Sequence, residues 1–287
     1  INYINQLKES GDDKYYHFHK QLDAYIERSK ARVMLNNISG AHSDLDQVLI
    51  RDPEYWEAYY HKGKLFMSIV DYSSALPYLE IAVENGLELN DLFILRGIAR
   101  FEQRARDLGL EDFEKLIKTK NLSESDRFKV LFYHSQLLFI SGDLDTSLDS
   151  AIEAYNLNSK DVSLLRHRGN LYRLLNSPNM AIEDFNDALN LGYDNRDLYL
   201  YRGLSYMQLN QHSNAELDLA KYLSLAQNSD SNMPQALLEF ATVKFYLDDI
   251  DEALSNLDAA SLTIFLAAIS SVVISAILNW RAWNSDI

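Results

Sequence analysis

Residues 162–191 read VSLLRHRGNLYRLLNSPNMAIEDFNDALNL, the most regular stretch in the chain. Its apolar residues recur every three or four positions on both sides of a central Asn-Ser-Pro turn, as two amphipathic helices require. Gly169 lies in the first half of this stretch, and Ala181 follows twelve residues later in the second half. The stretch therefore predicts a helical hairpin in which small residues let the two helices approach closely.

Small residues recur along the whole chain in two parallel series. The first series has spacings of 34 residues, with two spacings of 38, and contains Ser29, Gly63, Gly97, Ser135, Gly169, Gly203 and Ala241. The second series lies twelve residues further on and contains Ala41, Ala75, Gly109, Ser147, Ala181, Ala215 and Ala253. A period near 34 is typical of stacked helical hairpins. We therefore expect seven hairpins, packed through the glycines and alanines of both series.

The order of residues in these hairpins resembles that of the tetratricopeptide repeat family. The family's small residue, aromatic, Ala, aromatic and Ala occur in this order at Gly169, Tyr172, Ala181, Phe185 and Ala188. The resemblance covers about residues 22–260 and implies an all-α, right-handed superhelical solenoid of helix-turn-helix repeats. Long basic side chains replace an aromatic residue in three repeats, at Arg32, Arg100 and Lys244. These side chains can bury their stems and expose their charge, so the expected fold is unchanged.

The two ends of the chain lie outside the repeats. Residues 1–21 are expected to form a leading helix or a partial repeat. Residues 261–287 contain the uncharged run LTIFLAAISSVVISAILNW at 262–280, which as a helix of about 28 Å approaches the ~30 Å hydrocarbon thickness of a bilayer. We expect this helix to be a single C-terminal membrane pass, on an undetermined side of the membrane. The alternative is a hydrophobic helix that caps the solenoid of a soluble cytoplasmic protein.

The family resemblance also implies a binding groove, because the first helices of successive repeats line its concave side. By register, the groove residues are Tyr60, Lys64, Met67, Lys129, Phe132, Gln136, Phe139, Arg166, Asn170 and Arg173. Four of them are cations in a chain of formal charge -15. This predicts an acidic, partly aromatic peptide partner, since arginine holds a carboxylate through two parallel hydrogen bonds. The other interpretation is that these cations pair with neighbouring carboxylates and only solubilise the groove.

Composition and motifs argue against catalysis and several other roles. The negative charge disfavours binding to nucleic acid, which needs a basic stripe. The chain has no cysteine, which excludes disulfides, thiolate metal sites and cysteine nucleophiles. Its seven histidines form no metal-binding motif, and no phosphate-binding loop or Gly-x-Ser-x-Gly elbow occurs. We therefore expect no enzyme, cofactor, metal or small-molecule substrate.

The main functional hypothesis is a non-enzymatic protein–protein interaction scaffold that assembles a membrane-associated multiprotein complex through its groove. The alternative is a soluble peptide-binding adaptor or co-chaperone-like module, and a third interpretation is a regulatory subunit whose output lies in another domain. The carboxylate clamp of chaperone-binding family members is incomplete, because Arg166 and Asn170 match its first pair but Gln235 and Glu239 supply no cation. The chain begins at Ile1, without a signal run, and we leave open whether a leader or upstream segment precedes it.

Overall fold

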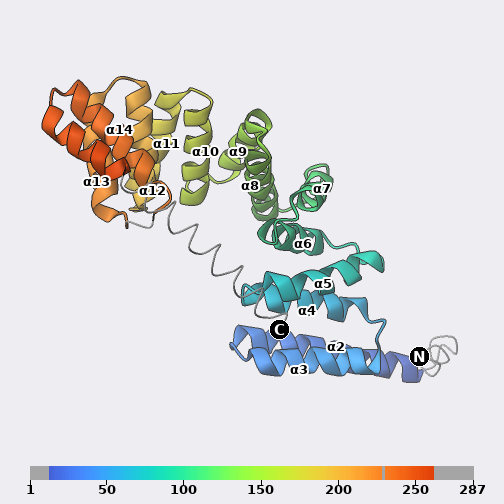
Figure 1. The fold of residues 1–287 in the computed structure, drawn as a ribbon. Coiled ribbons are helices and arrows are strands. Elements are labelled where there is room, and N and C mark those ends of the chain that lie inside the picture. Colours follow the sequence, from blue (N-terminus) through green and yellow to red (C-terminus); the bar gives the residue numbers. More distant parts are fainter. Residues whose placement is uncertain (1–12, 228–229, 262–287) are drawn as a thin grey trace, which may run out of the picture. The chain divides into compact units, whose positions relative to one another are not determined.

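The computed structural model describes residues 13–227 and 230–261, none of which lies in a strand. Thirteen helices are bounded within these residues (Figure 1): α2 (Asp13–Met34), α3 (Ile38–Arg51), α4 (Trp56–Ser68), α5 (Tyr72–Glu84), α6 (Asn90–Glu102), α7 (Arg106–Ile117), α8 (Glu124–Ser141), α9 (Leu144–Leu157), α10 (Val162–Leu174), α11 (Pro178–Asn190), α12 (Arg196–Gln208), α13 (His212–Leu225) and α14 (Met233–Tyr246). Residues 250–261 are also helical and follow α14. Residues 13–21 belong to the same helix as the start of the first predicted repeat.

The helices form two compact units, Ile1–Leu157 and Asn158–Ile287. Within each unit, a helix packs against the helix before it and the helix after it, so that α3 contacts both α2 and α4, and α11 contacts both α10 and α12. Each predicted hairpin therefore stacks on the next one of its unit. The chain is an all-α solenoid, as the 34-residue period predicts.

The small residues lie where the two helices of a hairpin meet. A Cβ atom at Gly169 would lie 2.6 Å from the ring of Phe185, and one at Gly63 would lie 2.4 Å from a methyl carbon of Leu79. Both distances are far below van der Waals contact, so any larger residue would push the helices apart. The eight residues proposed for repeat packing, Gly63, Gly97, Gly169, Gly203, Ala75, Ala181, Ala215 and Ala253, are all buried.

A residue in the left-handed backbone region ends the first helix of every hairpin. The seven positions are Asn36, Val70, Arg104, Gly142, Asn176, Asn210 and Asp248. They follow the same spacings of 34 and 38 residues as the two series of small residues. Asn, Asp and Gly adopt this conformation with little cost, whereas a β-branched residue is strained in it. Val70, at φ 61°, and Arg104, at φ 62°, depart from this preference, and Val70 is the β-branched residue among the seven.

Four hairpins contain a pair of an arginine and an aspartate sixteen residues apart, in which the aspartate is buried. In each pair the guanidinium donates two hydrogen bonds to the carboxylate, and the pairs are Arg28–Asp44, Arg96–Asp112, Arg168–Asp184 and Arg202–Asp218. The arginine comes from the first helix and directly precedes the small residue of the first series. Each pair thus joins the two helices of one hairpin through a fixed, planar contact.

Other residues occupy the arginine position in the remaining three hairpins. His134 Nδ1 lies 2.9 Å from the Ser150 hydroxyl, again sixteen residues on. Lys62 donates to the Tyr78 hydroxyl at 3.4 Å and to Asp46 at 2.5 Å. Phe240 occupies the position in the last hairpin, where its side chain joins the apolar core. Two of these three hairpins therefore keep a polar contact between residues sixteen apart, and the last one has an apolar contact instead.

The structure contradicts the predicted membrane localisation. Within residues 13–227 and 230–261, no helix is long and apolar enough to cross a bilayer. Of these helices only α2 and α8 reach 18 residues, and both carry several charged side chains, including Glu124, Asp126 and Arg127 in α8. The predicted span at 262–280 lies outside the described residues. We therefore withdraw the assignment to a membrane through a single C-terminal pass.

Candidate peptide-binding surface

The first helices of the hairpins form the inner surface of each unit. In the first unit α2 contacts α4, α4 contacts α6 and α6 contacts α8, and in the second unit α10 contacts α12 and α12 contacts α14. Among the described helices, the second helices of successive hairpins make no such contact. Helices on the inner side of a curved stack lie closer together than those on the outer side. The predicted groove residues all belong to these first helices.

The two predicted polar groove residues of α4 share one carboxylate. Lys64 Nζ donates to Asp91 of α6 at 2.8 Å, and the Tyr60 hydroxyl donates to the same carboxylate at 2.5 Å. Burial opposes ionisation of Asp91, but the bonds from Lys64 and Tyr60 outweigh it and lower the pKa of this carboxyl. The charge of Lys64 is therefore balanced within the chain, as the second interpretation of the groove cations requires.

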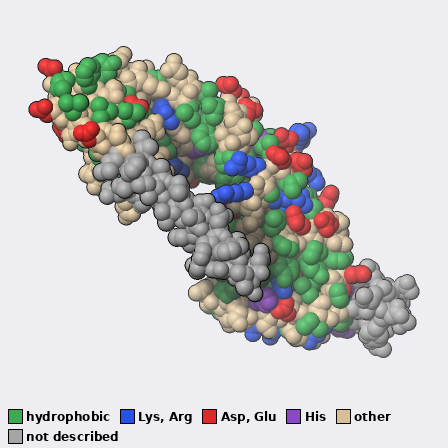
Figure 2. Space-filling model, in the orientation of Figure 1, with side chains coloured by type: hydrophobic (Ala, Val, Ile, Leu, Met, Phe, Trp, Pro, Cys, Tyr) green, Lys and Arg blue, Asp and Glu red, His purple; other side chains and the backbone are tan. Residues whose placement is uncertain are grey.

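The other predicted groove residues of the first unit also make contacts within the chain or are partly buried in it. Lys129 Nζ lies 3.5 Å from Asp126, one turn earlier in α8. Met67, Phe132, Gln136 and Phe139 are half-buried, and Met67 packs against the apolar core between α4 and α6. Figure 2 shows basic side chains beside acidic ones in the middle of the visible face.

The two arginines of α10 differ from these lysines. Within the described chain, neither Arg166 nor Arg173 has a carboxylate at ion-pair distance. Arg173 donates from Nε and from a terminal nitrogen to the side-chain oxygen Oδ1 of Asn170 at 3.2 and 2.8 Å, and its guanidinium lies 5.5 Å from the centre of the Tyr201 ring. The Nε atom of Arg166 is buried and has no hydrogen-bond partner among the described residues. Both guanidinium groups are therefore able to bind an anion.

Two neighbours of Arg173 complete this surface. Tyr201 of α12 supplies an aromatic face for the guanidinium, and burial raises the pKa of Glu239 in α14 although Arg173 lowers it. A carboxyl group whose ionisation is disfavoured is a weak competitor for the arginine. Tyr201 and Glu239 are not among the groove residues predicted from the sequence, and the structure brings both near Arg173. We call Arg166, Asn170, Arg173 and Tyr201 the α10 site.

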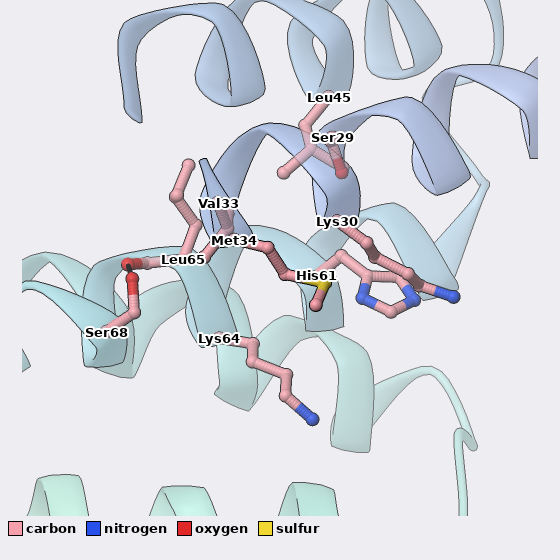
Figure 3. Close-up of a pocket in the computed structure, with 9 residues that line it drawn as sticks. All are labelled: Ser29, Lys30, Val33, Met34, Leu45, His61, Lys64, Leu65 and Ser68. Carbon is pink, nitrogen blue, oxygen red and sulfur yellow. Dashed lines mark hydrogen bonds between the residues drawn. The ribbon is translucent and has the colours of Figure 1, made fainter. Parts of the chain in front are cut away.

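A separate pocket of about 260 Å³ lies between α2 and α4 in the first unit. Figure 3 shows Val33, Met34 and Leu65 on one side of this pocket and His61 and Lys30 on the other. Lys64 also lines the pocket, but its ammonium group points away from Met34 (Figure 3). The pocket was not identified from the sequence, because its walls come from helices whose relative distance the repeat pattern does not give.

The pKa of His61 predicts how this region responds to acid. Burial, and then the charges of Lys30 and Lys64, lower this pKa from its ordinary value of 6.5 to about 4. The folded state therefore favours the neutral imidazole, and the resulting stability is present above pH 6.5 and is lost as the pH falls towards 4. We expect the urea midpoint of the native chain to fall more steeply between pH 6.5 and 4 than that of His61→Gln. Parallel pH curves for the two chains would contradict this assignment.

Comparison with known proteins supports the repeat family. Residues 26–88, which cover most of the first two hairpins, match the family model described as a tetratricopeptide repeat. The chain contains tetratricopeptide repeats. The tetratricopeptide repeat fold also appears in the solved structures of Pseudomonas aeruginosa PilF (TM-score 0.62, 14% identity, 79% of this chain and 98% of that one) and of YrrB (TM-score 0.53, 20% identity, 65% and 90%). At these identities the likeness shows the fold alone.

Curated relatives of this tetratricopeptide repeat chain are longer proteins. DnaJ homolog subfamily C member 3 from Homo sapiens is 22% identical over 218 residues, which cover 72% of this chain and 43% of that protein. The Rattus norvegicus protein of the same name matches with the same identity and coverage. The chain thus spans less than half the length of the curated relatives it matches.

Within the described residues, no three His, Asp or Glu side chains come together as metal ligands would.

Proposed function

We propose that this chain is a non-enzymatic adaptor that binds an acidic, partly aromatic peptide segment of a partner protein through the α10 site. The observation that carries the proposal is the pair of arginines, Arg166 and Arg173, which have no carboxylate at ion-pair distance within the described chain, although Glu239 acts on Arg173 from further away. Both arginines belong to α10, and Nε of Arg166 is buried without a hydrogen-bond partner among the described residues. Their separation by seven residues places both on one face of α10.

The chemistry of the α10 site favours a carboxylate over other anions. A guanidinium group donates two parallel hydrogen bonds to a carboxylate, and Asn170 already fixes the orientation of Arg173. Tyr201 lies beside the guanidinium and offers a flat apolar surface on which an aromatic side chain of the peptide can pack. The site therefore suits a peptide in which Asp or Glu alternates with aromatic residues.

The comparisons support the same class of function. The fold is shared with YrrB, which is described as a tetratricopeptide repeat protein with an unusual peptide-binding site. The likeness to DnaJ homolog subfamily C member 3 covers only part of that protein, and we transfer no activity from it. Peptide binding by the repeats is the function that the α10 site and the fold both favour.

Reversal of the α10 charges tests the proposal. Selection of peptides from a random dodecamer library on the purified chain is expected to enrich Asp, Glu and aromatic residues. The double variant Arg166→Glu/Arg173→Glu is expected to bind the enriched peptides at least tenfold more weakly, because each lost charge-assisted hydrogen bond contributes about 1.5–3 kcal/mol. Fluorescence anisotropy with labelled peptides measures this loss.

A control variant separates the site from the general effect of charge. Lys118→Glu/Lys160→Glu changes the net charge by the same amount at two exposed positions outside the α10 site, and we expect it to retain native affinity. The proposal fails if both double variants lose the same affinity, or if the selected peptides show no enrichment of acidic residues.

A further inference from the structure

Val70 combines two unfavourable properties in one turn. Its backbone is left-handed, at φ 61°, a region that crowds a β-branched side chain. Its side chain is also 66% exposed, so the chain gains little from burying it. An asparagine, as found at Asn36, Asn176 and Asn210 in the equivalent turns, would remove both costs. A strained and exposed apolar residue at such a position points to a contact outside the chain.

Three neighbours extend Val70 into an exposed apolar surface. Ile69 precedes it and is 44% exposed, and in the equivalent turn of the first hairpin Met34 and Leu35 are 88% and 79% exposed. The third hairpin has Gln103 and Arg104 at the corresponding positions, so the apolar surface ends after the second hairpin. We call Met34, Leu35, Ile69 and Val70 the turn patch.

The turn patch continues into the pocket between α2 and α4. Met34 belongs to both, and Ser68, which lines the pocket, directly precedes Ile69. An apolar cavity of about 150 Å³ accepts a benzene ring, whereas pockets for drug-sized ligands measure about 300–1,000 Å³. The volume of about 260 Å³ therefore fits one large apolar side chain better than a whole small molecule or cofactor.

The charges at the pocket select the kind of partner. Lys30 lies beside His61 in Figure 3 and is paired with Glu27, an exposed contact one turn earlier on α2. Such exposed pairs exchange readily for another carboxylate. The charges of Lys30 and Lys64 lower the pKa of His61, whereas those of Glu27 and Asp91 raise it. Lys64 is held by Asp91, so Lys30 is the cation at the pocket that can take a new partner. The apolar walls of the pocket, with Lys30 at their edge, are complementary to an apolar side chain next to an acidic one.

We infer that the turn patch and the pocket form a second docking surface, which binds a short acidic and apolar segment of another protein. One large aliphatic or aromatic side chain of this segment occupies the pocket, and further apolar side chains cover Val70 and Leu35. A neighbouring carboxylate faces Lys30. This surface lies in the first unit, uses none of the residues of the α10 site, and does not depend on the proposed function of that site.

An NMR titration of the methyl-labelled full chain tests the inference. The probes are the amidated, acetylated peptides Glu-Leu-Leu-Glu-Phe-Leu-Glu and Lys-Leu-Leu-Lys-Phe-Leu-Lys. We expect the methyl signals of Met34 and Val70 to shift with the acidic peptide, at an affinity at least fivefold above that for the basic one. Val70→Asn is expected to weaken binding of the acidic peptide at least fivefold while it raises the melting temperature by about 2–4 °C, because the strain is relieved.

Two further variants keep the test specific. Asn176→Val introduces the same strain into the equivalent turn of the fifth hairpin, and we expect it to lower the melting temperature without a change in peptide affinity. Arg166→Glu/Arg173→Glu is expected to leave this affinity unchanged, which separates the turn patch from the α10 site. The inference is overturned if Val70→Asn binds the acidic peptide as the native chain does, or if both peptides bind equally. It is also overturned if the Met34 signal shifts with protein concentration alone, which would identify a second copy as the occupant.

Discussion

Replacement of Arg168 by alanine is expected to lower the free energy of unfolding by about 3–5 kcal/mol. Arg168 and Asp184 share two hydrogen bonds of 2.9 and 2.6 Å, and their side chains are only 8% and 4% exposed. The variant leaves the Asp184 carboxylate buried without its guanidinium. Burial already raises the pKa of Asp184 even with Arg168 in place. Urea unfolding followed by circular dichroism measures the loss.

The dependence on pH and on the partner residue makes this prediction specific. The folded state favours the protonated form of a carboxyl group whose pKa is raised. The loss of unfolding free energy in Arg168→Ala should therefore be smaller at pH 4 than at pH 7. The double variant Arg168→Met/Asp184→Leu, which removes both charges, should be within about 1 kcal/mol of the native chain.

Arg28 provides a matched comparison for Arg168. Its side chain is 54% exposed, and Asp44 retains a second cation, Arg32, at 2.7 Å. Arg28→Ala should therefore cost about 1 kcal/mol or less. Equal losses for Arg28→Ala and Arg168→Ala would show that burial of the pair is not the cause.

Replacement of Phe185 by alanine is expected to cost about 3–5 kcal/mol, since it removes a fully buried ring from the centre of a hairpin. The Phe185 ring occupies the space that a side chain at Gly169 would need, at 2.6 Å from an added Cβ atom. In the native chain Gly169→Ala is therefore expected to cost about 1–3 kcal/mol. Both values are measurable by the same urea unfolding.

Gly169→Ala should have opposite effects on the free energy of unfolding in the native chain and in the Phe185→Ala variant. In the Phe185→Ala background the ring no longer blocks the Gly169 methyl group, and alanine is the better helix former by about 0.5–1 kcal/mol. Gly169→Ala should therefore stabilise this background although it destabilises the native chain. Additive losses in the double variant would show that the two positions do not share the same space.

The fold could be predicted from the sequence because it depends on small side chains at regularly spaced positions. The series from Ser29 to Ala241 marks where helices must approach closely, and the turn residues Gly142 and Asn210 mark where each first helix ends. Both signals are local and repeat with the hairpin. They required no knowledge of which side chains meet, and this explains why the hairpins were predicted better than the site.

The candidate sites depend on contacts between residues far apart in the sequence. Arg166 and Arg168 differ by two positions, yet Arg168 is buried against Asp184 whereas Arg166 has no carboxylate partner among the described residues. Lys64 is assigned to the groove by the same repeat pattern as the other groove cations, but it is paired with Asp91, 27 residues on in the next hairpin. Helical periodicity assigns a face to each cation, but it does not reveal whether a carboxylate from the next hairpin neutralises that charge. The strain at Val70 likewise requires a backbone angle.

The sixteen-residue spacing of the arginine–aspartate pairs has a consequence for how such a chain can lengthen or shorten in evolution. Both members of each pair belong to the same hairpin, so duplication or deletion of a whole hairpin copies or removes a complete pair. For these four hairpins the event separates no arginine from its aspartate, so this source of a buried, unpaired charge is avoided. Lys62 is different, because its partner Asp46 lies in the preceding hairpin. Hairpins with an arginine–aspartate pair can therefore be gained or lost by recombination while they remain neutral at this position.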